Sequence, residues 1–173
     1  MNPLEEVWDW YLRTRFVLRF VDRLGEKHWE KPPDDLPLFR DEKFKEVKSK
    51  DLIEGARVGL ESLDDLAVIR FFAAFEAIVR GQLRDEVENE LKTIKHLVLV
   101  DAAQEAIKTI ARGSFAWVLD SLKGLDHNLV EQVRQIRRYR NWVSHGRRGN
   151  APPRVGPKET FDRLSAFLRL LDP

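Results

Sequence analysis

The chain has 173 residues, the length of one domain or of one domain with a small appendage. It contains no cysteine, which excludes disulfides and thiolate metal sites and suits a reducing cytoplasm. Its 30 basic and 29 acidic side chains leave a net charge of +1, so overall charge indicates no anionic partner. No segment has the roughly 18 consecutive apolar residues of a membrane-spanning helix, and the N-terminus does not resemble a signal peptide. We therefore expect a cytoplasmic protein that does not associate with membranes.

The first part of the chain has the apolar spacing of an amphipathic helix over residues 3–24, and Gly25 is expected to end it. A segment rich in glycine and proline, residues 25–37, predicts a loop. Short helices are predicted after it, over residues 39–47 and 51–60.

The most apolar part of the chain follows Ser62, which begins Ser-Leu-Asp-Asp and is expected to cap a new helix. This helix is predicted to reach about Lys92, with Gly81 as a point where it breaks. Its segment "LAVIRFFAAFEAIV" is apolar on nearly every side, with charge only at Arg70 and Glu76. Because a helix that is apolar all round is normally buried, this segment is predicted to be the central helix.

The remaining chain predicts four more helices in a row. They cover residues 97–112, 115–122, about 128–145 and 158–171, with glycines at 113, 124 and 146 as stops. Asp126 or Asn128 is the expected cap of the third of these helices. The fold class is therefore an all-α bundle of about five long helices plus short ones. We expect an N-terminal helical extension over residues 1–60 and the bundle over residues 61–173, within one compact domain overall.

Positive charge is concentrated in "RRYRNWVSHGRR", Arg137 to Arg148, which holds five arginines, an asparagine and a histidine. No Asp or Glu occurs between Gln132 and Lys158. A charge run is usually a solvated helix face, but the lack of a compensating acid favours an anionic partner.

Arg140 stands out by helical phase, because it falls on the apolar stripe of its helix. The apolar members of that stripe are Leu129, Val133, Ile136 and Val143. A buried guanidinium is costly unless it is paired, and Glu76, the acid inside the most apolar helix, is its expected partner. Two interpretations remain open: a buried ion pair that fixes helix register, or a functional site.

Asn141 and His145 are four residues apart, so they share one face of this helix. Histidine transfers protons near neutral pH, and arginine binds phosphate or stabilises charge in a transition state. This chemistry requires no metal and no cofactor. The other histidines, His28, His96 and His127, lack partners at metal-ligand spacing, so no metal site is predicted.

The segment "RNWVSH" has the R-x4-H form of HEPN domains, helical domains of many prokaryotic toxins and RNA-cutting defence proteins. The segment "VIRFFAAFEAIVR" is similar to the second conserved helix of several HEPN subfamilies, in which a Phe-Glu pair recurs. The resemblance covers roughly residues 62–148. It implies a HEPN-like bundle and a metal-independent endoribonuclease that acts as a toxin or defence effector.

The resemblance also implies roles for individual residues. His145 would act as general base or acid at the ribose 2′-hydroxyl, Arg140 would bind the adjacent phosphate, and Asn141 would orient the phosphate or the histidine. Glu76 would support Arg140. The RNA-binding residues would be Arg137, Arg138, Arg147 and Arg148.

The implied partners are RNA, a second copy of the chain whose motif shares one cleft, and an antitoxin or regulatory protein. Some toxin subfamilies carry a tyrosine two residues after the histidine, where this chain has Arg147, so the chain is not placed in that subgroup. Two alternatives to the enzyme stay open. One is a non-catalytic module that binds RNA or nucleotides at the same helix end, and the other is a helical interaction protein.

Overall fold

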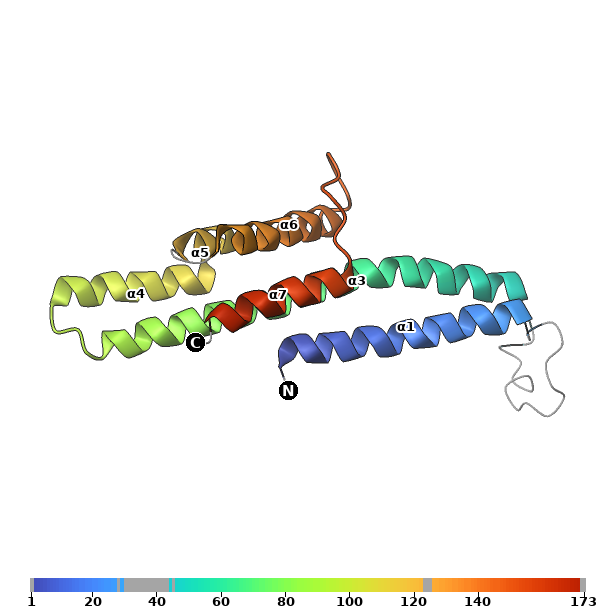
Figure 1. Ribbon diagram of the computed structural model, residues 1–173, viewed down its shortest axis with the longest axis horizontal. Coiled ribbons are helices and arrows are strands. Elements are labelled where there is room, and N and C mark those ends of the chain that lie inside the picture. The colour runs from blue at the N-terminus through green and yellow to red at the C-terminus, as the bar shows by residue number, and fades with distance from the viewer. Residues whose placement is uncertain (1, 28, 30–43, 45, 123–125, 172–173) are drawn as a thin grey trace. The chain divides into compact units, whose positions relative to one another are not determined.

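Six α-helices form the regular structure of the computed structural model, which describes residues 2–27, 29, 44, 46–122 and 126–171 (Figure 1). No strand occurs in these residues, which confirms the predicted all-α class. The predicted short helix over residues 39–47 lies largely outside the described residues. The helices are α1 (Pro3–Lys27), α3 (Ser49–Leu91), α4 (Leu97–Arg112), α5 (Phe115–Ser121), α6 (His127–Ser144) and α7 (Pro157–Leu171).

Helix α3 is continuous over 43 residues, so the predicted cap at Ser62 and the break at Gly81 are wrong. In the N-terminal part of the helix the reason is tertiary packing at Gly59, whereas a Cβ atom at Gly81 would meet nothing within 4 Å. A Cβ atom at Gly59 would lie 3.1 Å from Leu18 of α1, so the glycine allows close packing there. Burial against neighbouring helices stabilises a helix more than local propensity does. Despite its length, α3 is not apolar enough to cross a membrane, and no other helix in the described residues is either.

Helix α1 continues through Gly25 to Lys27, so the expected helix stop is also wrong. Gly25 is buried, and a Cβ atom added to it would lie 2.8 Å from Ile53 Cγ1. This glycine is required by close approach of α3, and it does not end the helix.

The chain forms two units, and the division falls inside α3. The first comprises residues 5–67, in which α1 and the first part of α3 run antiparallel. Tyr11 Oη donates to Asp64 Oδ1 at 2.9 Å, and Ser49 Oγ donates to the Gly25 carbonyl at 2.6 Å. Burial, reinforced by the Asp64 carboxylate, raises the pKa of Tyr11. These two contacts join opposite ends of α1 to opposite ends of this α3 segment.

The second unit contains the rest of α3 with α4 to α7, and phenylalanine rings fill its core. The Phe75 ring centroid lies 5.8 Å from that of Phe115 and 5.3 Å from that of Phe167, both nearly perpendicular to it. Phe72 makes a similar contact with Phe115, at 5.6 Å. Edge-to-face geometry is the favoured arrangement for aromatic pairs. These buried rings show that the middle of α3 lines the core of this unit. Arg70, Ala73 and Ala77 on its other side are exposed, so the expected burial on every side is wrong.

Candidate functional site

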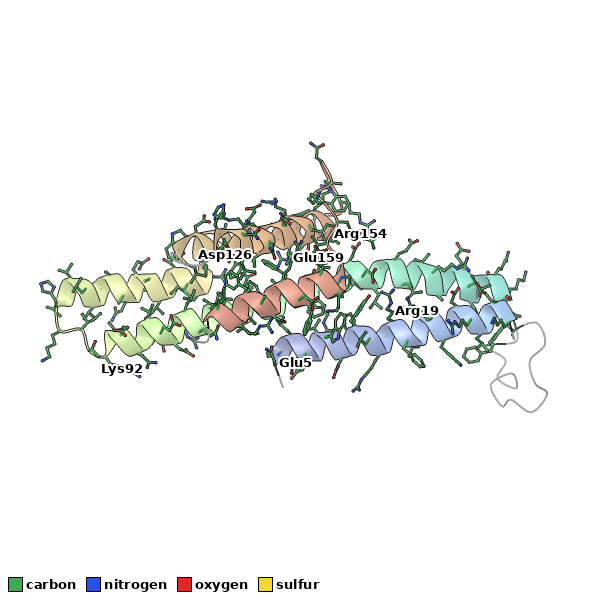
Figure 2. All side chains as sticks on the ribbon, in the orientation of Figure 1. Glu5, Arg19, Lys92, Asp126, Arg154 and Glu159 are labelled. Atoms are coloured by element: carbon green, nitrogen blue, oxygen red, sulfur yellow. The ribbon has the colours of Figure 1, made fainter. Side chains whose placement is uncertain are left out.

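Helix α6 carries the Arg-x4-His motif, and its first turn is fixed by Asp126 (Figure 2). The Asp126 side chain accepts a hydrogen bond from the Asn128 amide at 2.9 Å. An aspartate in this position satisfies an amide that the helix leaves unpaired. Asp126, one of the two predicted caps, is therefore the residue that caps α6.

A Schellman motif ends α6 directly after the histidine. Gly146 has φ 73°, its amide donates to the Val143 carbonyl at 3.0 Å, and the Arg147 amide donates to the Trp142 carbonyl at 2.8 Å. Arg147 also has a positive φ, 59°. The predicted stop at Gly146 is confirmed, and His145 becomes the last residue before the chain turns away.

We expect Gly146→Ala to lower the free energy of unfolding by about 1–2 kcal/mol, because an alanine Cβ disfavours the left-handed conformation. An added Cβ would meet nothing within 4 Å, so the cost comes from the backbone alone. Urea denaturation followed by circular dichroism measures it. Gly156 is the matched control, since it is equally open but has no positive φ, and Gly156→Ala should leave stability unchanged or slightly higher. Equal effects of the two substitutions would contradict this account.

The buried stripe of α6 differs from the predicted one. Its buried residues are Val130, Val133, Ile136 and Tyr139. Tyr139 therefore takes the core position that the sequence assigned to Arg140, while Leu129 and Val143 are only partly buried. Arg140 lies at the border of the core, where its stem is covered.

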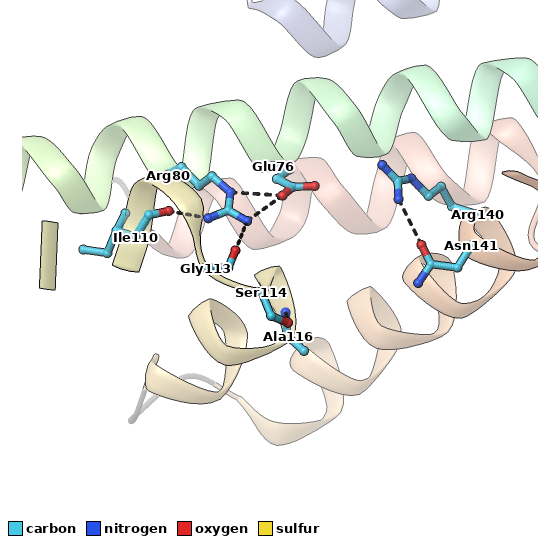
Figure 3. Close-up of polar contacts among 8 residues, drawn as sticks. All are labelled: Glu76, Arg80, Ile110, Gly113, Ser114, Ala116, Arg140 and Asn141. Carbon is cyan, nitrogen blue, oxygen red and sulfur yellow. Dashed lines mark hydrogen bonds and ion pairs between the residues drawn. The ribbon is translucent and has the colours of Figure 1, made fainter. Parts of the chain in front are cut away.

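Arg140 contacts both the core and its neighbour on the helix. Its Cζ atom lies 5.5 Å from the centroid of the Phe72 ring, and its Nη1 donates to Asn141 Oδ1 at 2.9 Å (Figure 3). Its Nε is buried and has no hydrogen-bond partner among the described residues. A guanidinium over an aromatic face gains about 0.5–2 kcal/mol, so the ring stabilises the cation without neutralising it.

Glu76 is not the partner of Arg140. Its Oε1 accepts hydrogen bonds from Arg80 Nε at 3.0 Å and Arg80 Nη2 at 2.7 Å (Figure 3). Arg80 is one turn further along the same helix, where a glutamate and an arginine pair readily. Arg140 forms no ion pair with any described residue, and its positive charge is left to a ligand or to solvent.

Arg80 is the residue that sequence reasoning missed. Besides Glu76, it donates to the carbonyl oxygens of Gly113, at 2.9 Å, and of Ile110, and its Cζ lies 5.4 Å from the Phe115 ring centroid. It therefore joins α3 to the link between α4 and α5. The sequence contained a signal for this ion pair, because Glu76 and Arg80 are four residues apart and only apolar residues lie between them.

Asn141 and His145 lie one turn apart, as predicted, and the His145 amide donates to the Asn141 carbonyl at 3.0 Å. Because arginine only donates, the side-chain oxygen of Asn141 must face Arg140, and Figure 3 shows the amide nitrogen directed away. His145 is exposed, and no described residue hydrogen-bonds to its imidazole. Arg140 and Asn141 are thus in contact, and His145 lies one turn beyond Asn141 at the end of the same helix.

The positive field around the motif is weaker than the sequence indicated. Arg138 donates to Glu131 at 2.6 Å, and Arg134 pairs with both Asp120 and Glu131. The hydrogen bond from Arg138 is the main cause that lowers the pKa of Glu131. The expected lack of a compensating acid is therefore wrong for these two arginines, because Glu131 directly precedes the stretch without acids and Asp120 comes from α5.

The other predicted RNA-binding residues lie around the end of α6. Arg148 is exposed and Arg137 is partly buried, and neither forms an ion pair with a described residue. The Arg147 guanidinium carbon lies 5.7 Å from the Trp142 ring centroid. Arg140 and Arg148, which form no ion pair with a described residue, thus lie at the same end as His145, and Arg137 lies two turns earlier than His145.

This arrangement offers a phosphate two donors, a guanidinium and an amide, with an exposed imidazole one turn away. No group of three or more His, Cys, Asp or Glu side chains in the described part of the chain is arranged to hold a metal ion. No known protein family, curated protein or solved structure matches the chain.

Proposed function

We propose that the protein is a metal-independent endoribonuclease of the HEPN type that acts on RNA in the cytoplasm as a toxin or defence effector. The observation that carries the proposal is Arg140, a partly buried guanidinium that forms no ion pair with a described residue and contacts Asn141 beside the exposed His145. A purely structural arginine at the core border would be expected to have a carboxylate partner. Glu76, the carboxylate predicted as its partner, pairs with Arg80 instead.

The proposed reaction is a transesterification. His145 removes the proton from a ribose 2′-hydroxyl, whose oxygen attacks the adjacent phosphorus while the bond to the 5′-oxygen breaks. The leaving 5′-oxygen takes up a proton from water, His145 later releases its proton to solvent, and the products carry a 2′,3′-cyclic phosphate and a 5′-hydroxyl. Arg140 stabilises the charge that develops on the phosphate, and the free amide hydrogens of Asn141 hold a second oxygen. DNA is not cut because it lacks the nucleophile.

The test is cleavage of end-labelled RNA by the purified protein in the presence of EDTA. We expect His145→Ala to lower the cleavage rate by at least about 100-fold, the usual contribution of a general acid or base. His127 is the matched control, since it is an exposed histidine at the start of the same helix, and His127→Ala should cut at the parental rate. Cleavage by His145→Ala as fast as by the parent would show that the assignment is wrong.

A second measurement separates the enzyme from the non-catalytic alternative. RNA binding that weakens steeply with salt, with no cleavage product at any time, would favour a binding module built on the same cations. Arg140→Ala would then weaken binding while His145→Ala would not. In the enzyme, by contrast, both substitutions lower the cleavage rate, and His145→Ala leaves RNA affinity nearly unchanged.

A further inference from the structure

Helix α1 exposes an apolar face that no described residue covers. Phe16, Phe20 and Leu12 are 71%, 59% and 45% exposed. At about 100° per residue, all three fall within about 40° of the direction of Phe16. The buried residues Val7 and Tyr11 lie on the opposite side of the helix. That side faces the interior of the first unit. Isolated exposed apolar residues are ordinary, but three consecutive turns of them indicate a binding surface.

Opposite charges lie at the two ends of this face. Asp9 and Arg23 are each seven residues from Phe16, so by the helical period they lie within about 20° of its direction. Both are exposed, and neither forms an ion pair with a described residue. By the helical period, Arg13 and Arg19 lie on the two flanks of the face, and Arg19 is labelled in Figure 2. The face is therefore acidic at one end, basic at the other and apolar between them.

We propose that this face binds a second copy of itself, with the two α1 helices antiparallel and crossing at Phe16. A two-fold axis at Phe16 places each residue opposite the one equally far on the other side of it. Asp9 then meets Arg23 of the second copy, Leu12 meets Phe20, and Phe16 meets Phe16. The axes of two packed helices lie about 8–10 Å apart. At this distance the side chains of both Asp9–Arg23 pairs come into contact.

The charge pattern selects a second copy over a lipid surface. A basic amphipathic helix that lies on anionic lipid carries cations along its polar face, whereas Asp9 would oppose the headgroups at one end of this face. Pairing with a second copy satisfies both ends at once. It also turns two antiparallel helix pairs, each made of α1 and the first part of α3, into a four-helix arrangement, which is a stable way to bury such faces.

The proposal rests on α1 and is independent of the Arg140–His145 motif. The dimer is expected to form whether or not RNA is cut. Failure of the ribonuclease assay leaves it standing, and failure of the pairing leaves the motif's chemistry untouched.

Sedimentation velocity over a range of concentrations provides the first test. We expect the full chain to be a dimer at micromolar concentration and Phe16→Asp to be a monomer with an unchanged far-ultraviolet circular dichroism spectrum. Leu97, on α4 and 79% exposed, is the matched control, and Leu97→Asp should remain dimeric. A parent that is monomeric throughout, or a Phe16→Asp variant that dimerises as tightly as the parent, would overturn the proposal.

Charge reversal tests the antiparallel geometry. Asp9→Arg alone and Arg23→Asp alone each place like charges together twice per dimer, so each should weaken self-association by at least about ten-fold. An equal mixture of the two single variants restores both opposite-charge pairs, and so does the double variant, so both should dimerise at parental affinity. Single variants that stay weak when mixed would contradict antiparallel pairing at this face.

Binding to lipid vesicles tests the alternative that the face contacts a membrane surface. One outcome is a parent that is monomeric in solution and sediments with phosphatidylserine–phosphatidylcholine vesicles, while Phe16→Asp does not bind them. This result would overturn the pairing and show that the face binds a lipid surface. The absence of vesicle binding, together with a dimer that Phe16→Asp dissociates, supports the pairing.

Discussion

Phe75→Ala is expected to lower the free energy of unfolding by about 4 kcal/mol, the usual cost of deleting a buried ring. Phe75 is fully buried and its ring contacts Phe115 of α5 and Phe167 of α7, so the cavity would open between three helices. The loss of two edge-to-face pairs adds to the cost of the transferred apolar surface. Urea denaturation followed by circular dichroism measures the change.

Two controls locate the effect in the core. Phe75→Leu keeps most of the volume and should cost about 1–1.5 kcal/mol. Leu97→Ala removes an apolar side chain that is 79% exposed and should change stability by less than about 0.5 kcal/mol. If Phe75→Ala were no more destabilising than Leu97→Ala, the central place of this ring in the second unit would be wrong.

The centre of α3 could be predicted because its sequence leaves few alternatives. A strongly apolar segment favours burial, and Phe71, Phe72 and Phe75 are all buried. The face that carries Arg70, Ala73 and Ala77 stays exposed, because small and charged side chains tolerate water. The end of α4 was equally predictable, since Gly113 follows its last residue. Local signals of this kind need no information about distant parts of the chain.

The continuity of α3 and the extension of α1 could not be predicted, because both depend on contacts between distant segments. Gly25 and Gly59 look like helix breakers in sequence, yet each lies where one helix approaches the other closely. A glycine at a contact and a glycine at a helix end have the same local sequence signal. Only the packing partner, Ile53 for Gly25 and Leu18 for Gly59, distinguishes them.

The candidate site was predictable only along its own helix. The spacing of Asn141 and His145 fixes their common face, and Gly146 fixes where the helix stops. The surroundings of Arg140 were not predictable, because a shift of one residue moves Tyr139 into the core and Arg140 to its border. The choice of Glu76 as its partner failed because Arg80 is closer along the same helix.

Arg80→Ala is expected to lower the free energy of unfolding by about 3 kcal/mol, the low end of the cost of removing one partner from a buried ion pair. Arg80 and Glu76 are only partly covered, so the loss falls short of that for a fully buried pair. The substitution also leaves the carbonyl oxygens of Ile110 and Gly113 without the donor that joins α3 to the α4–α5 link. Urea denaturation measures the change.

Arg84 is the matched control one turn further along α3. Its side chain is half exposed and pairs with Asp85 and Glu88 at the surface, so Arg84→Ala should cost less than about 0.5 kcal/mol. A double-mutant cycle of Arg80→Ala with Glu76→Ala should give a coupling energy of about 1–2 kcal/mol, because the two side chains act as one unit. The same cycle between Glu76 and Arg140 should give a coupling energy near zero. A large coupling there, with none at Arg80, would restore Glu76 as the partner of the motif arginine.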